Sequence, residues 1–228
     1  HRVVYRHADT PLVSILVPTK DRDELIRPCI DHLLEKTTYP NFEVIIVDNQ
    51  SSAPAVLQYY EELTSRDPRV RLLHYPRPFN FSAICNLGAD AARGDYLLLL
   101  NNDTRIVQGE WLERMMSHAQ RPEVGAVGAR LVYPQTGRVQ HAGVVLGLNH
   151  VADHPFCGIV GLDEGGYMDR ALVDQNYSAV TAACMLMRTS VYEAVGGMDE
   201  TRLRVSYNDV DLCLRIIKEG YKITYTPY

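Results

Sequence analysis

Short runs of hydrophobic residues alternate with segments of helical periodicity over the first 132 residues of the chain. Uninterrupted apolar runs are typical of strands buried on both faces of a parallel sheet, and apolar positions three or four apart predict covering helices. The pattern predicts an α/β fold with a Rossmann-like, mostly parallel central sheet flanked by helices. We expect strands at 12–17, 43–48, 69–75, 95–100 and 124–132, and helices at 23–36, 55–65, 81–92 and 110–119.

Two prolines affect these elements. Pro18 closes the first apolar run, and we expect the strand to stop there because proline cannot donate to the ladder. Pro28 lies within the first helical segment and predicts a late start or a kink.

The second half of the chain predicts a smaller, irregular and antiparallel part. Residues 133–180 are rich in Gly, His, Asp and Tyr, and we expect a hairpin around 135–137. Beyond them we expect a strand at 185–188, a short helix at 190–195, an amphipathic helix at 208–219 and a last strand at 221–225. The sequence contains no repeat, low-complexity segment or linker, so we expect one domain over 1–228.

The composition, 46% hydrophobic and 22% charged, is that of a globular protein. A formal charge of −5 gives no indication of a nucleic-acid partner, and no apolar run reaches the roughly 18 residues of a membrane span.

The five cysteines include no CxxC pair, which predicts reduced thiols in a cytoplasmic protein and no structural zinc. The chain begins at His1 without a signal peptide, so we expect a domain excised from a longer protein.

Common nucleotide-binding and hydrolase motifs are missing. The loop Pro18-Thr19-Lys20-Asp21-Arg22 contains no GxGxxG, and the chain contains no GxxxxGK[ST], GxSxG or HExxH. These absences argue against a Rossmann dinucleotide site, a P-loop, an α/β-hydrolase and a zincin. A nucleotide bound here would need another partner for its phosphates, and a divalent metal is the usual substitute.

Acid and amide side chains recur where predicted strands end, at Asp21, at Asp48-Asn49 and at Asn101-Asn102-Asp103. Ligands of open α/β sheets bind at this edge, although an Asp after a strand also serves as a turn former or helix cap. The 101–103 triplet places oxygen ligands where Mg²⁺ or Mn²⁺ would need them, with an Asx turn as the alternative.

The last amphipathic helix opens with polar residues that suit a catalytic base. Asn208 or Asp209 can be a plain N-cap, with Asp211 favourable in the first turn. A carboxylate fixed in this way is also what a general base requires.

Other polar residues lie outside these strand ends. Asn80 can cap the predicted helix at 81–92, whereas Asn86 lies inside it, where its amide needs a partner. His141, His150 and His154 lie within 14 residues and suit metal ligands, but loop histidines usually have other roles.

Six segments, taken together, resemble a known family: VSILVPTKDR, EVIIVDNQS, NFSAICNLGADAARGDYLLLLNNDT, SAVTAACMLMR, VGGMDE and NDVDLCLRIIKEGY. In type and order they are similar to motifs of the inverting GT-A fold glycosyltransferases of family 2. They resemble most the bacterial branch that builds O-antigens and other surface polysaccharides, which includes rhamnosyltransferases. The resemblance extends from about Pro11 to the end of the chain.

The resemblance implies a role for each matching residue. Asp209, in the family's ED motif, would be the catalytic base, and Asp103, in its DxD motif, would bind Mg²⁺ or Mn²⁺. The donor-binding residues would be Pro18, Thr19, Asp21, Asp48, Asn80, Asn86, Asn101 and Asn102. The acceptor-side residues would be Thr181, Ala182, Ala183, Cys184, Asn208 and Asp211.

It also implies the substrates and the reaction. Residues 1–132 would bind a UDP-, dTDP- or GDP-linked sugar, and residues 133–228 a saccharide or lipid-linked saccharide acceptor. The base would take a proton from the acceptor hydroxyl, which would attack the anomeric carbon opposite the metal-bound diphosphate and invert it. The enzyme would be cytoplasmic, bind no nucleic acid, and contact the inner face of the cytoplasmic membrane only peripherally.

Two departures from the family pattern bear on activity. Asn101 replaces the first acid of the metal motif, and the chain ends at Tyr228 before the His that completes the family's metal site. We therefore expect this chain to bind metal poorly. The alternatives are a non-catalytic sugar- or nucleotide-binding relative and a sugar nucleotidyltransferase, although the loop at 19–21 fits a triphosphate poorly.

Overall fold

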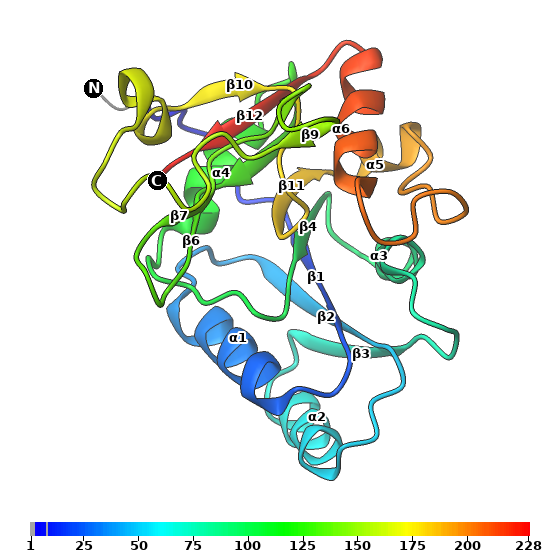
Figure 1. Ribbon diagram of the computed structural model, residues 1–228. Helices are drawn as coiled ribbons and strands as arrows, with labels where there is room; N and C mark the ends of the chain where they lie inside the picture. The colour runs from blue at the N-terminus through cyan, green and yellow to red at the C-terminus, as the bar shows by residue number, and fades with distance from the viewer. Residues whose placement is uncertain (1–2, 8) are drawn as a thin grey trace.

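A computed structural model describes residues 3–7 and 9–228 and has an eight-stranded sheet at its centre (Figure 1). The strands are β1 (Val13–Thr19), β2 (Phe42–Asp48), β3 (Val70–His74), β4 (Tyr96–Leu100), β5 (Val124–Ala129), β10 (Gln175–Tyr177), β11 (Cys184–Arg188) and β12 (Lys222–Thr226). Their order is β10-β12-β5-β11-β4-β1-β2-β3. Only β10 and β11 run antiparallel to their neighbours in this sheet of the described chain, which confirms the predicted, mostly parallel arrangement.

Helices cover both faces of the sheet (Figure 1). One face packs against α1 (Asp23–Lys36), α2 (Pro54–Arg66) and α4 (Trp111–Ala119). The other packs against α3 (Phe81–Asp90), α5 (Thr189–Ala194) and α6 (Asn208–Lys218). In β4, Leu98 and Leu100 contribute to the first core and Leu97 and Leu99 to the second, as expected from the alternation of side chains along a strand.

The predicted irregular part packs on the face that carries α6. It contains β6 (Leu131–Val132), β7 (Val139–His141), β8 (Val145–Leu146), β9 (Ala152–Asp153) and a short 3₁₀ helix, η1 (Tyr167–Leu172). The hairpin expected around 135–137 is confirmed, because β6 pairs with β7 and Gly137 N–H donates to Tyr133 O at 2.8 Å. Its buried side chains, such as Phe156 and Val160, join the same hydrophobic core as α6.

Two predicted strand limits are wrong. Strand β1 continues through Pro18 to Thr19, because its pairing with β4 ends at Leu16 and Pro18 needs no ladder hydrogen bond on that side. The strand expected at 124–132 ends at Ala129, since Leu131–Val132 pairs with β7 in a separate sheet.

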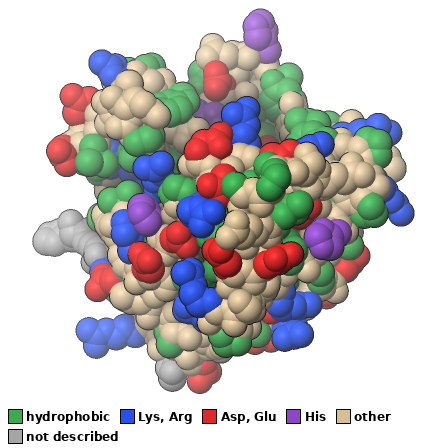
Figure 2. Space-filling view, turned by 90° about the horizontal axis from the view of Figure 1, so that it is seen from below, with side chains coloured by type: hydrophobic (Ala, Val, Ile, Leu, Met, Phe, Trp, Pro, Cys, Tyr) green, Lys and Arg blue, Asp and Glu red, His purple; other side chains and the backbone are tan. Residues whose placement is uncertain are grey.

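The late start or kink predicted at Pro28 is also wrong, because α1 runs without a break from Asp23 to Lys36 with Pro28 inside it. All five cysteines are free thiols, as expected, and four of them are buried. No helix within residues 3–7 and 9–228 is long and apolar enough to cross a membrane. The face seen in Figure 2 carries interspersed acidic and basic side chains, in keeping with the small net charge.

Candidate active site at the carboxyl edge of the sheet

Two segments far apart in the sequence meet where β4 ends. Strand β11 runs antiparallel to β4 with Cys184 opposite Leu100, so the residues before β11 lie beside those after β4. The N–H of Asn101 donates to the carbonyl oxygen of Ala183 at 3.0 Å. This hydrogen bond joins the predicted metal motif to the predicted acceptor segment, 181–184.

The carboxylate of Asp209 is fixed over this junction. Asp209 lies in the first turn of α6, and its Oδ2 accepts a hydrogen bond of 3.1 Å from Ala182 N–H. Its Oδ1 accepts from Val210 N–H at 2.9 Å. The side chain is half-buried and held by two backbone donors, so its direction is defined.

The cap of α6 differs from expectation. Tyr207, rather than Asn208 or Asp209, occupies the N-cap position, with a left-handed φ of 60° and no capping hydrogen bond from its side chain. Asn208 is buried in the first turn, where its Oδ1 accepts from Asp209 N–H at 2.9 Å. The amide of Asn208 therefore supports Asp209 from within the helix.

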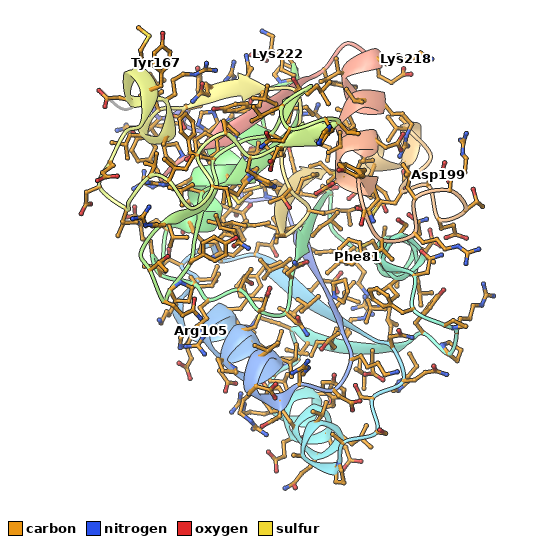
Figure 3. All side chains as sticks on the ribbon, viewed as in Figure 1. Phe81, Arg105, Tyr167, Asp199, Lys218 and Lys222 are labelled. Carbon is orange, nitrogen blue, oxygen red and sulfur yellow. The ribbon has the colours of Figure 1, made fainter. Side chains whose placement is uncertain are left out.

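A buried serine, Ser82, ties the starts of α3 and α6 together. Its Oγ accepts from Asn208 Nδ2 at 3.0 Å and donates to Leu203 O at 2.5 Å. Figure 3 shows Phe81, at the start of α3, and Asp199, in the loop before α6, on the same side of the molecule. Sequence reasoning missed Ser82, because a single Ser in a helix carries no recognisable signal.

The predicted donor residues Asn80 and Asn86 hold this loop. Asn80 caps α3 as expected and donates to Glu200 O at 2.9 Å. The Oδ1 of Asn86 accepts from Tyr192 Oη–H and Met198 N–H, and its Nδ2 donates to Met198 O and to Glu200 Oε2. The partner that Asn86 needs is therefore the 198–200 loop, and its contact with a donor stays a prediction.

The two acids of the predicted nucleoside pocket bind the loop before α2. Asp21 Oδ1 accepts from Ala53 N–H at 2.9 Å and from Ser52 N–H at 2.7 Å, and these bonds hold the pKa of Asp21 below its usual value. Asp48 is 2% exposed and accepts from Ser51 N–H at 3.1 Å. Both carboxylates thus shape one loop at this edge.

The other predicted residues differ in whether the structure places them at this edge of the sheet. Asn102 Nδ2 donates to Thr19 Oγ1 at 2.9 Å, so the ends of β4 and β1 are joined at the edge. Asp211 forms an ion pair with Arg215 one turn along α6. Cys184 is buried in the core on the opposite face from α6, so the structure does not bring its thiol to Asp209.

Asp103 could hold a divalent cation only together with ligands from outside the described chain. Its carboxylate is exposed and makes no hydrogen bond or ion pair with the rest of the described chain. Residues 3–7 and 9–228 contain no group of three His, Cys, Asp or Glu that could hold a metal alone. One carboxylate completed by substrate phosphates and water is a ligand set that Mg²⁺ commonly takes.

A cavity of about 570 Å³ opens beside the loop that follows Asp103. Thr104 and Arg105 of the loop after Asp103 line it together with Leu100 and Trp111. A concave, largely apolar site of this size is typical of small-molecule binding.

The three histidines of the irregular part do not form a metal site. His141 is fully buried and its Nδ1 lies 2.9 Å from Nδ1 of His154, whereas His150 is exposed. Burial lowers the pKa of His141 well below its ordinary value of 6.5, and also lowers that of His154. Both rings are therefore neutral near pH 7.

This burial predicts acid sensitivity of the fold. The unfolded chain binds a proton at His141 below about pH 6.5 that the folded chain does not bind, so the free energy of unfolding falls as the pH drops from 6.5. The slope is at most about 1.4 kcal/mol per pH unit for one such histidine. The free energy of unfolding, measured with urea between pH 7 and 5, should fall less steeply with decreasing pH in His141→Asn. In His150→Asn it should fall as steeply as in the unchanged chain. Equal slopes for all three proteins would contradict this assignment.

Comparison with known proteins gives one family. The family model described as Glycosyl transferase family 2 matches residues 14–196. The chain is 43% identical to the O-antigen biosynthesis protein RfbC of Myxococcus xanthus, over 99% of the chain and 17% of RfbC. It is also 43% identical to protein y4gI of Sinorhizobium fredii, over the whole chain and 25% of y4gI, so it spans a quarter or less of these relatives.

Solved structures share the fold. A mannosyltransferase from Pyrobaculum calidifontis in complex with GDP-Man and Mn²⁺ matches 99% of this chain and 58% of its own, with a TM-score of 0.70 and 17% identity. GalNAc-T7 with UDP, GalNAc and Mn²⁺ matches 97% and 43%, with a TM-score of 0.76 and 12% identity.

Proposed function

Because the chain belongs to glycosyltransferase family 2, we propose that it transfers a sugar from a nucleotide-diphosphate sugar to an acceptor hydroxyl, with inversion, in bacterial polysaccharide synthesis. The 43% identity to RfbC supports the polysaccharide context. The observation that carries the proposal is the hydrogen bond from Ala182 N–H to Asp209 Oδ2. It fixes a carboxylate beside the segment that also binds Asn101, at the edge where α/β sheets bind ligands.

Asp209 is the general base in this proposal. Two backbone N–H donors orient its carboxylate, and the half-buried site leaves the acid in reach of an acceptor hydroxyl. The acceptor oxygen gives its proton to Asp209 and bonds to the anomeric carbon as the bond to the diphosphate breaks. Inversion needs this single displacement, and a nucleoside diphosphate leaves without a second carboxylic acid.

Asp103 would hold Mg²⁺ or Mn²⁺, with the oxygens of Asn101 and Asn102 beside it. A bound cation would neutralise charge on the departing diphosphate. The Mn²⁺ in both structural relatives supports a metal-assisted reaction. Because Asn101 stands in place of an acid, the affinity of the site for the metal depends more on the donor's phosphates.

The substrates in this proposal follow the predicted classes. GDP-Man and UDP in the two structural relatives support a UDP-, dTDP- or GDP-linked donor. The acceptor is a saccharide or a lipid-linked saccharide. Action in the cytoplasm, with peripheral contact at the inner face of the membrane, stays a prediction.

A donor panel tests this proposal. The chain is incubated with UDP-, dTDP- and GDP-sugars and Mn²⁺, with and without p-nitrophenyl glycosides, and release of nucleoside diphosphate is measured. We expect release from one donor class, stimulated by an acceptor. Binding of donors without any turnover would favour the non-catalytic alternative.

A further inference from the structure

We propose that His154 donates a hydrogen bond from Nε2 to the acceptor saccharide beside Asp209, and that buried His141 is the positioning residue that fixes His154 for this role. The inference rests on the proposed function and names an acceptor-side group for the same site.

The two histidines form a defined pair. Their Nδ1 atoms are 2.9 Å apart, and their rings meet edge to face with centroids 5.0 Å apart. His141 lies at the end of β7 without solvent exposure, and its ring also packs edge to face against Tyr225. His154 directly follows β9 and is only partly buried. The pair thus reaches from the core to the surface.

Hydrogen bonding decides where the protons lie. The N–H of Gly143 donates to Nε2 of His141 at 3.4 Å, so a neutral His141 must carry its proton on Nδ1. That Nδ1–H can only donate to Nδ1 of His154 across the 2.9 Å contact. His154, also neutral, then carries its own proton on Nε2. The backbone at Gly143 therefore selects the tautomer of His154 through His141.

The Nε2 side of the His154 ring is free to bind a ligand. Its Nε2 makes no hydrogen bond within the described chain and is not closed off from solvent. Burial lowers the pKa of His154, while the nearby carboxylates of Asp209 and Asp153 act in the opposite direction. Strand β9 lies beside α6 in Figure 1, which agrees with this electrostatic contact.

The chemistry suits a donor better than a metal ligand or a second base. A proton lies between the two Nδ1 atoms, so they cannot both bind one cation. A neutral ring with Nε2–H can donate to a sugar oxygen but has no lone pair left to take its proton. Asp209, as an acceptor only, and His154, as a donor, together complement a sugar hydroxyl or ring oxygen.

The test compares variants of each histidine. His154→Leu removes the donor, whereas His154→Gln places an amide N–H near the position of Nε2. His141→Leu removes the tautomer lock, and His141→Asn keeps an N–H where Nδ1–H lies. His150→Asn, an exposed change in the same part of the chain, is the matched control.

With the donor and the p-nitrophenyl glycoside selected by the panel, we expect His154→Leu to raise the acceptor KM about tenfold, as loss of one hydrogen bond implies. The donor KM and the acceptor-independent hydrolysis of the donor should change less than about twofold, and His154→Gln should recover part of the loss. His141→Leu should behave like a weaker His154→Leu, and His141→Asn should recover part of that loss. A merely structural role would instead raise both KM values and lower the hydrolysis rate together.

Nitrogen-15 NMR of the unchanged chain tests the tautomers without any substrate. We expect a protonated Nδ1 in His141 and a protonated Nε2 in His154, and the opposite tautomer of His154 would overturn the inference. An unchanged acceptor KM in His154→Leu would also overturn it while leaving the proposed function intact. If the unchanged chain turns over no donor, the proposed function fails and this inference fails with it.

Discussion

Asp209→Asn should lower the rate of sugar transfer by roughly 10²- to 10⁴-fold, the usual contribution of a general base. The amide keeps an oxygen that can accept from Ala182 N–H, so the local fold should persist. It cannot accept the proton of the acceptor hydroxyl. The transfer rate and the dissociation constant of the donor are measured for the variant and for the unchanged chain. The transfer rate should fall by this large factor, whereas the dissociation constant of the donor should change less than about twofold.

Glu219→Gln is the matched control for this variant. Glu219 is an exposed carboxylate just after the other end of α6, so its neutralisation leaves transfer unchanged. Full activity of Asp209→Asn would remove Asp209 as the base.

Asp103→Ala should abolish the metal dependence of donor binding. In calorimetry with UDP, GDP or dTDP, Mn²⁺ should strengthen binding to the unchanged chain, and loss of the carboxylate should weaken the complex at least about tenfold. Asp103 is exposed and unpaired within the described chain, so its removal should alter the free energy of unfolding by less than about 0.5 kcal/mol.

Asp95→Ala provides the matched control for Asp103→Ala. Asp95 is an exposed acid at the amino end of the same strand, away from the edge that carries Asp103. Its removal should leave nucleotide affinity with Mn²⁺ unchanged. Equal affinities of all three proteins in the presence of Mn²⁺ would contradict the assignment of Asp103.

The architecture was predictable from the sequence because its main signals are local. The continuous run Tyr96–Leu100 and the amphipathic pattern of Asn208–Lys218 each identify an element without knowledge of its partners. The two wrong strand limits depend on which neighbouring strand each residue pairs with. Val124–Val132 reads as one strand, yet Leu131–Val132 pairs with β7, and Pro18 is tolerated because β4 has already ended beside it.

The candidate site was predictable as a set of residues rather than as a geometry. Asp209 and Asp103 were identified through family motifs, and the family itself is confirmed by the match over 14–196. The connections between them run through backbone groups of Ala182 and Ala183, whose side chains give no signal in a sequence. The individual roles of these residues stay predictions until the variants are measured.

The pairing of the two histidines was beyond sequence reasoning for a related reason. His141 and His154 stand in an irregular segment with no period that would place them on a common face. Only the folding of β7 and β9 over the α6 side of the molecule brings their Nδ1 atoms to 2.9 Å from each other.

The most direct test of the central claim, a single displacement assisted by one base, is the anomeric configuration of the product. Proton NMR of the product formed from the selected donor and acceptor reads this configuration from the coupling of the anomeric proton. We expect the linkage to have the opposite configuration to that of the donor. A product that retains the donor's configuration would contradict the direct displacement and the role of Asp209 as its base.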